Sequence, residues 1–268
     1  ATAERLRSVS PIELLTAVFV VCSFGLFFLY GRFFSFAMVA WLDADLNWWL
    51  VVHISSSSLW LLLAFPQLSH TVKSSRLHRV RGYVAFVCLL LSTTTADAVL
   101  FKDLLERGAD WKRLFTSASN MTLSSAVAYF GVEGVALAMA RKLQKHQKVM
   151  THTYWLLFAA LTPRGVSLFL QFVLRYDASA AYTFGVAFFF LLNLKKSAHS
   201  YDRHRQIPVH LGNFANALLF LWGVRTGAFH FFGQAYAPLL GTVVHMASSM
   251  VYLSAFRDIL LRGESSEC

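Results

Sequence analysis

Residues 82–101 read GYVAFVCLLLSTTTADAVLF, and this stretch decides the class of fold. A helix that crosses a hydrocarbon core about 30 Å thick needs about 20 predominantly apolar residues. The stretch has that length and carries a single charged residue, Asp97, near its end. It therefore predicts a transmembrane helix with one acid inside the membrane.

The composition extends this prediction to the whole chain. Of 268 residues, 56% are hydrophobic and 14% are charged, with 25 Phe and 7 Trp. A soluble domain carries about 25% charged residues, and a soluble fold with this composition would expose large apolar patches. We expect one all-α transmembrane domain over residues 1–268. The net charge of +10 lies in short loops between apolar segments, which suits anionic lipid and excludes nucleic acid as a partner.

Further apolar stretches predict a bundle of eight membrane-spanning helices, with seven as the alternative. The loops 70–81, 141–151 and 195–207 are basic, and eight spans place all three loops and both termini on one side of the membrane. The sixth stretch is short for a span. The predicted spans are Pro11–Tyr30, Trp48–Leu68, Gly82–Phe101, Phe115–Ala140, His152–Leu174, Ala180–Leu194, Pro208–Gly227 and Pro238–Leu261.

Ionisable residues at membrane depth are costly and call for a partner or a function. Two imidazoles, His53 and His245, could ligate a haem b iron, with Arg164 or Arg225 pairing with a propionate. A quinone-type site is a related possibility. The favoured interpretation is structural: Asp97 pairs with an arginine, and the histidines bond backbone carbonyls or serines.

A second acid, Glu133, lies in the fourth predicted span, with His78, His152 or His210 as its expected partner. A structural hydrogen bond is the favoured interpretation. A proton or small-solute path through Asp97, Arg164 and Glu133 is the alternative. The three cysteines show no metal-ligand spacing, and we expect no metal site.

Two basic turns resemble a known family. Residues 77–82 read Leu-His-Arg-Val-Arg-Gly, and residues 146–152 read His-Gln-Lys-Val-Met-Thr-His, with His53 in the preceding span. The pattern resembles the predicted membrane proteins of domain of unknown function 2306 over roughly residues 48–175. Val149 and His152 stand where the family pattern has Trp and Arg. The resemblance implies a membrane fold and no established chemistry.

The residues of these two turns also predict a cationic pocket at adjacent helix ends. His78, Arg79, His146 and His152 would bind a phospholipid headgroup or another anion. They could equally cap helix termini.

The leading functional hypothesis is a non-enzymatic accessory subunit of a larger membrane complex, with lipids and other membrane subunits as partners. The sequence has no hydrolase, nucleotide-binding or metalloprotease motif. A respiratory or other energy-converting membrane, and the mitochondrial inner membrane in particular, is the preferred location. A haem or quinone redox protein and a proton or solute transporter are the two alternatives.

Overall fold

The computed structural model of the chain describes residues 48–68, 76–108, 110–159, 203–227 and 233–265, with 166, 169–171, 173–177, 180–181, 183–185, 187–188 and 191. The described elements are helices: α3 (Trp48–Leu68), α4 (Arg76–Arg107), α5 (Trp111–Met139), α6 (Leu143–Ala159), α9 (Arg203–Arg225) and α10 (Gly233–Ser265). No strand occurs among these residues, which confirms the all-α class. The predicted span Pro11–Tyr30, about half of Ala180–Leu194, and Arg164 lie outside the described residues.

The helix bounds agree with the predicted spans where apolar residues define the helix. α3 has the predicted bounds. α6 begins at Leu143 rather than His152, because its first turns are polar and the apolar pattern marks only the part of a helix that faces lipid or protein. α4 likewise extends beyond 82–101 at both ends, into the charged residues of its flanks.

Two described helices are long and apolar enough to cross a membrane, over Arg76–Glu106 in α4 and Arg113–Met139 in α5. Shorter apolar helical segments cover Trp48–Ala64 and Ala237–Val251. The described part of the chain is thus a helical bundle with its two candidate membrane spans at its centre. The count of eight spans stays a prediction.

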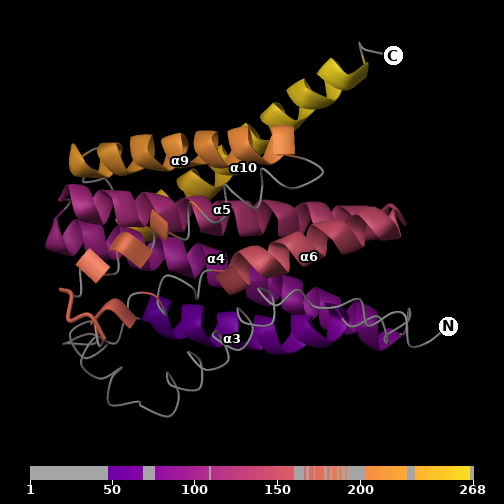
Figure 1. The fold of residues 1–268 in the computed structure, drawn as a ribbon, viewed down its shortest axis with the longest axis horizontal. Helices are drawn as coiled ribbons and strands as arrows, with labels where there is room; N and C mark the ends of the chain where they lie inside the picture. The colour runs from indigo at the N-terminus through magenta and orange to yellow at the C-terminus, as the bar shows by residue number, and fades with distance from the viewer. Residues whose placement is uncertain are drawn as a thin grey trace.

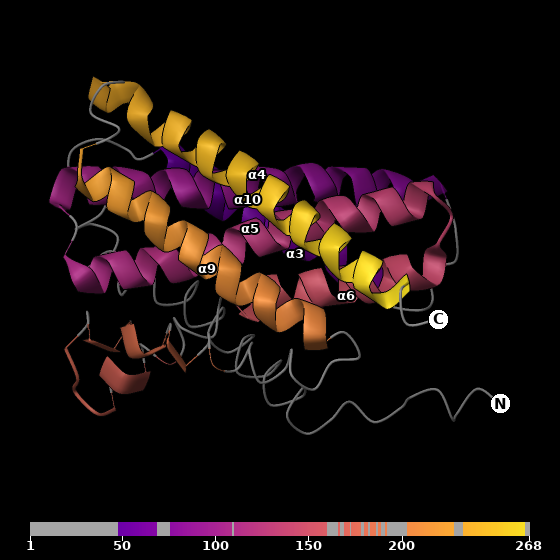
Figure 2. The same ribbon diagram turned by 90° about the horizontal axis from the view of Figure 1, so that it is seen from above.

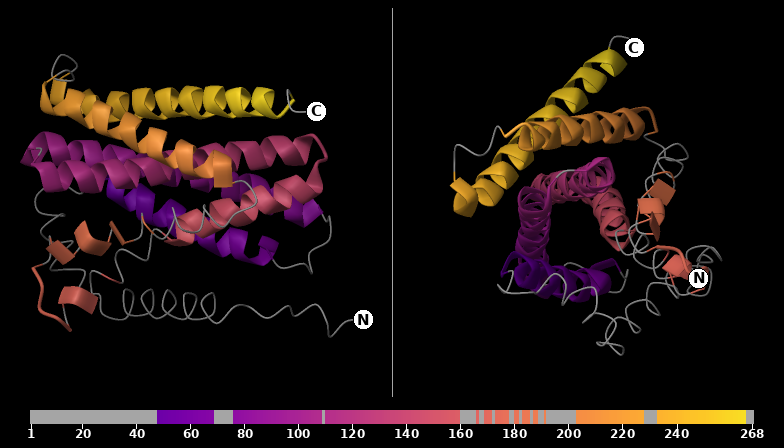
Figure 3. Two further views of the ribbon diagram at one scale, coloured as in Figure 1. Left: turned by 45° about the horizontal axis from the view of Figure 1, so that its top comes forward. Right: turned by 90° about the vertical axis from the view of Figure 1, so that its left-hand side faces the viewer.

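The helices form two groups that share α4 and α5. α3 packs along α4, and α5 packs along α6 and α9, while α10 crosses both α4 and α9. Viewed end-on, α3, α4, α5 and α6 form a four-helix group, and α9 and α10 lie together on one side of it (Figure 3). α4 and α5 are therefore the helices through which the two groups contact each other.

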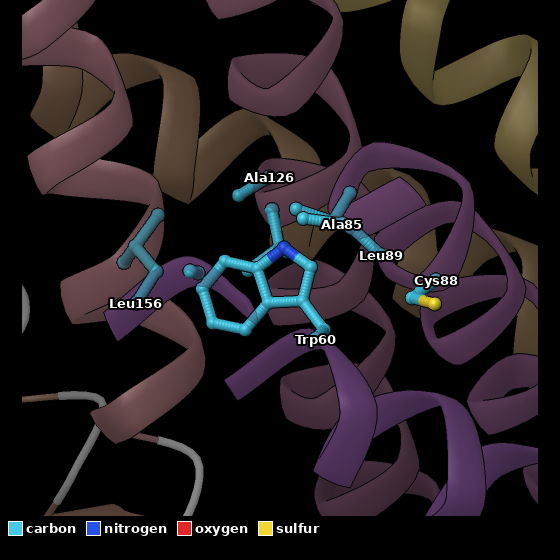
Figure 4. Packing of buried hydrophobic residues seen from close by; sticks show 8 residues of the cluster. Trp60, Ala85, Cys88, Leu89, Ala126 and Leu156 are labelled. Carbon is cyan, nitrogen blue, oxygen red and sulfur yellow. The ribbon is translucent and has the colours of Figure 1, made fainter. Parts of the chain in front are cut away.

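The core of the four-helix group takes one large side chain from each helix (Figure 4). Trp60 of α3 stacks on Tyr154 of α6 with ring centroids 5.3 Å apart. Leu89 of α4, Val127 of α5 and Leu156 of α6 are fully buried around the indole. Burial of these side chains fixes the positions of the four helices relative to one another.

A second apolar cluster joins α4 and α5 to α9. Phe101, Met121 and Leu221 are its fully buried members, and Phe220 meets Phe101 edge to face at 5.7 Å. α10 approaches the cluster closely at Gly241, where a Cβ atom would lie 3.2 Å from the Phe101 ring. This second cluster is called the apolar plug below; its buried members are Phe101, Leu104, Leu114, Ala118, Met121, Ala217, Leu221 and Val224.

The bundle has two chemically different ends. The start of α4, the α5–α6 turn and the C-terminal end of α10 lie at the same end of the molecule (Figures 1 and 2). Here Arg141 adopts a left-handed conformation with φ 56° and ends α5. At the other end, Gly108 follows the last residue of α4 and has φ 78°. Asp110 then caps α5 by accepting a hydrogen bond from the backbone N–H of Arg113. The first end is called the basic end; its exposed cations include Arg76, Arg79, Arg141, Lys142, Lys145 and Lys148.

Candidate functional site

Asp97 of α4 and His245 of α10 form a buried acid–base pair. Asp97 Oδ2 lies 2.8 Å from His245 Nδ1, and both side chains have an exposed fraction of 0%. The two residues are 148 positions apart in the chain. Because an isolated charge in a membrane interior costs several kcal/mol, each group requires the other at this depth.

Three further helical side chains extend the pair into a chain of hydrogen bonds. The hydroxyl of Ser124 in α5 donates to Asp97 Oδ1. On the far side of the imidazole, Ser249 Oγ lies 3.4 Å from His245 Nε2. Asn216 of α9 donates from Nδ2 to Ser249 Oγ at 3.1 Å. Four helices therefore meet at one continuous polar network.

The geometry defines where a proton can reside. An ionised Asp97 only accepts hydrogen bonds, so His245 donates to it through Nδ1–H. In the neutral imidazole Nε2 then accepts from the Ser249 hydroxyl, and in the imidazolium Nε2–H donates to Ser249 Oγ. A second proton on His245 thus reaches Nε2 through Ser249 without disturbing the bond to Asp97.

The order Asp97, His245, Ser249 is also that of a hydrolytic triad, but the surroundings do not suit acyl transfer. Ser249 is fully buried and lies one turn beyond His245 on the same helix. Backbone N–H groups in the middle of a helix are bonded to carbonyls within it, so they cannot form an oxyanion hole. The network is suited to holding and passing protons.

Other acids and bases are scarce at this depth. Residues 82–101 of α4 contain only Asp97, residues 114–132 of α5 contain none, and residues 233–256 of α10 contain only His245. Residues 206–224 of α9 contain only His210. At a rise of about 1.5 Å per residue, Asp97 lies about 15 Å from the end of α4 at Arg107. The pair is therefore inside the span rather than at its rim.

The structure does not bring His53 and His245 together. His53 Nδ1 donates to the backbone oxygen of Ser92 on α4 at 2.9 Å, from the α3 side. His245 bonds Asp97, also on α4, from the α10 side. A haem between the two imidazoles would have to occupy the place of α4, so the predicted ligand pair lacks a shared site in this arrangement.

The remaining buried-charge predictions have different outcomes. Asp97 pairs with a histidine rather than with an arginine. Arg225 is exposed at the end of α9 with its guanidinium 5.4 Å from the centroid of the Trp222 ring, so the expectation that it is buried was wrong. Glu133 is half-buried on α5. Arg225 is exposed because it lies in the last turn of α9, where a long side chain reaches the interface.

The residues of the predicted cationic pocket lie at or near the basic end, and the pocket itself stays a prediction. His78 and His146 are half-buried and close enough to interact electrostatically, and Arg79 is exposed beside them. His146 Nδ1 donates to the backbone oxygen of Gly134 in α5 at 2.7 Å, and this bond holds the start of α6 against α5. The half-buried His152 meets the Phe130 ring edge to face at 4.8 Å, one turn or more further along α6.

Sequence reasoning missed three members of the network: Ser124, Ser249 and Asn216. Each is a small polar residue within a predicted span, a type that usually satisfies its own helix backbone. The spacing of Ser249 four residues after His245 places both on one helical face and could have indicated the contact. Asn216 has no comparable signal, because its contact depends on how α9 packs against α10.

A sequence model of a protein family described as predicted membrane protein (DUF2306) matches residues 50–196, more than half of the chain. The match covers α3 to α6 and includes Asp97 and Ser124, whereas Asn216, His245 and Ser249 lie beyond it. No curated protein matches the chain, and no solved structure does.

Proposed function

The chain belongs to the DUF2306 family of predicted membrane proteins, and on that premise we propose that it is a proton-coupled membrane carrier. The Asp97–His245 pair is its intramembrane proton-binding site. The single observation that supports this function is the 2.8 Å contact between two ionisable groups that are both fully buried between membrane helices. Intramembrane acids and imidazoles in contact are the usual elements of proton relays in pumps and transporters.

The pair has three protonation states with different net charges. With one proton the pair is neutral overall, as carboxylate and imidazolium or as acid and imidazole. Loss of that proton leaves a net negative charge in the bundle, and gain of another leaves a net positive charge. Both charged states are costly in a low-dielectric interior, so proton binding or release favours movement of α10 relative to α4. This coupling between proton occupancy and helix packing is what a carrier requires.

Proton flux into liposomes tests the proposal. The full-length protein is reconstituted into vesicles loaded with a pH-sensitive dye, and a potassium diffusion potential drives protons inward. We expect acidification that falls at least tenfold in Asp97→Asn and in His245→Gln, which keep size and polarity but cannot form the ion pair. Glu106→Gln is the matched control, because Glu106 is an exposed carboxylate on the same helix, paired with Lys102 at 3.6 Å.

Two results would contradict the proposal: vesicles with the unmodified chain that acidify no faster than empty ones, and flux that persists in the Asp97→Asn, His245→Gln double variant. Size exclusion and tryptophan fluorescence of each variant establish that the bundle is folded before flux is compared.

The accessory-subunit hypothesis draws on a different feature of the bundle. α4 presents an exposed apolar face that would suit a partner helix, formed by Val80, Val84, Val87 and Leu91. Lipid covers such a face equally well, so this hypothesis rests on the sequence argument. The proton-coupled carrier rests on a specific contact.

A further inference from the structure

The buried face of α9 changes character halfway along the helix. His210, Asn213 and Asn216 lie on successive turns in its first half, and His210 and Asn213 are buried. The second half of the same face is apolar, with Ala217, Leu221 and Val224 buried in the apolar plug. The first half leads from the start of α9 to Asn216, which donates to Ser249 in the proton-binding network. α9 is therefore polar on one side of the network and apolar on the other.

Two buried polar atoms of this stretch have no hydrogen-bond partner among the residues that the structure describes: His210 Nε2 and Asn213 Oδ1. The exposed fraction is 5% for His210 and 0% for Asn213. Asn213 Nδ2 already donates to the backbone oxygen of Thr122 in α5, at 3.0 Å, so the orientation of its amide is fixed. A donor or acceptor on one turn and an acceptor on the next are the partners that a buried water molecule bridges.

The apolar plug closes the opposite direction. Phe101 and Leu104 follow Asp97 along α4, and Leu114 and Met121 precede Ser124 along α5. These positions lie between the acid–base pair and the end of the bundle that carries Gly108. Phe101, Met121 and Leu221 are fully buried in the plug, and their side chains offer water no polar atom to bind. Access from this end requires the plug to open.

We infer that His210 and Asn213 bind water and form the route by which protons reach the Asp97–His245 pair from the basic end. This inference rests on the proposed proton-binding function and adds a direction to it. A proton moves through water bound at His210 Nε2 and Asn213 Oδ1 to the Ser249 hydroxyl, which Asn216 Nδ2 holds in place, and the hydroxyl proton of Ser249 passes to His245 Nε2. An O–H bond breaks at each water molecule and at Ser249 as the next O–H or N–H bond forms, the amides of Asn213 and Asn216 keep their protons, and no other reactant is consumed.

Hydrogen–deuterium exchange at the pair tests the route. The full-length protein in lipid is switched from H2O to D2O while infrared difference spectroscopy follows the histidine and carboxyl bands, assigned with His245→Gln and Asp97→Asn. We expect the half-time of exchange to rise at least tenfold in His210→Leu and in Asn213→Leu. His210→Gln, which restores a polar atom at the same depth, should stay within threefold of the unmodified protein. Leu211→Ala, an exposed neighbour on α9, is the matched control.

The outcomes separate the inference from the function on which it rests. Unchanged exchange in a folded His210→Leu, Asn213→Leu double variant would overturn the route while leaving Asp97-dependent proton flux intact. Should the double variant fail to fold, Asn213→Val and His210→Gln provide the comparison, and equal exchange in both overturns it too. Faster exchange after Phe101→Ala than after Phe101→Leu supports the plug as the closed side. Equal proton flux in the unmodified protein and in Asp97→Asn would count against the carrier function itself.

Discussion

Among the described residues, Asp97 has two partners: His245, which can carry the opposite charge, and Ser124, which only donates a hydrogen bond. Substitutions of Asp97 distinguish the two contributions. Asp97→Ala leaves the His245 imidazole buried without its acid, whereas Asp97→Asn keeps an acceptor at Oδ1 for the Ser124 hydroxyl and places an NH2 donor at the position of Oδ2, to which a neutral imidazole can present Nδ1 as an acceptor. Breaking a buried pair by removing one member costs about 3–5 kcal/mol, and a membrane hydrogen bond is worth about 0.6 kcal/mol on average.

The expected order of stability follows from these values. Asp97→Ala should lower the free energy of unfolding by about 3 kcal/mol, and Asp97→Asn by about 1 kcal/mol. The measurement is unfolding in mixed micelles with increasing denaturing detergent, followed by tryptophan fluorescence. Adding His245→Ala to Asp97→Ala should restore part of the loss, since no unpaired group remains. A double variant less stable than the sum of both single changes would show that the pair is not the source of the effect.

Trp60 provides a second test at the residue scale, away from the network. Its indole is 1% exposed and stacks on Tyr154 between the helices of the four-helix core. We expect Trp60→Ala to cost about 3–5 kcal/mol because of the cavity left behind, and Trp60→Phe to cost less. The Leu62 side chain on the same helix is 72% exposed. Leu62→Ala should therefore change the free energy of unfolding by less than about 0.5 kcal/mol. Equal effects at both positions would argue against this packing.

At the scale of elements, the close contact between α10 and α4 depends on Gly241. A methyl group there would lie 3.2 Å from a ring carbon of Phe101, and Gly241 lies one turn before His245. Gly241→Ala should therefore push α10 away from α4 and weaken the Asp97–His245 bond. Overpacking costs about 1–3 kcal/mol, partly offset by about 1 kcal/mol of helix propensity gained.

A paired substitution identifies the contact as the cause. In Gly241→Ala, Phe101→Leu, the smaller side chain accepts the methyl group, and both stability and the infrared signature of the pair should return toward the unmodified protein. Ser254→Ala, at an exposed position of α10, is the control. A signature that stays unchanged in Gly241→Ala alone would mean that α10 is not held at this point.

Apolar length predicted the helices well, but not their neighbours. α3 has the predicted bounds because its ends coincide with changes in hydropathy, while the polar first turns of α6 gave no such signal. Depth along a helix predicted that His53, Asp97 and His245 lie within the membrane. It could not predict that α4 separates the two histidines, because the rotation of each helix is decided by packing between distant segments. The same limit hid Asn216, while the family resemblance, which depends on local turns, was confirmed.

At the scale of the whole molecule, the separation of charge between the two ends predicts an orientation. The exposed cations of the α4 start and the α5–α6 turn share one end, and positive loops remain on the cytoplasmic or equivalent face. In a chain whose native cysteines are replaced by serine, Arg76→Cys and Lys142→Cys should react with an impermeant maleimide from the same side of a sealed membrane.

Glu106→Cys, at the other end of α4, should react only from the opposite side. Ala96→Cys, within the span, is the unreactive control. Labelling of Arg76→Cys and Glu106→Cys from one side would mean that α4 does not cross the membrane. The location in a mitochondrial inner membrane does not follow from the packing of the helices, and it stays a prediction.

The distance of 148 positions between Asp97 and His245 has a consequence for how the chain is made. At a synthesis rate of about 5–20 residues per second, α4 emerges roughly 7–30 s before the imidazole that pairs with its acid. For that interval the nascent helix carries a carboxyl group without its base. It must be protonated, retained at the insertion machinery or shielded by another protein before it can settle in lipid. A chain truncated before α10 would keep Asp97 without His245, and we expect quality-control proteases to degrade it.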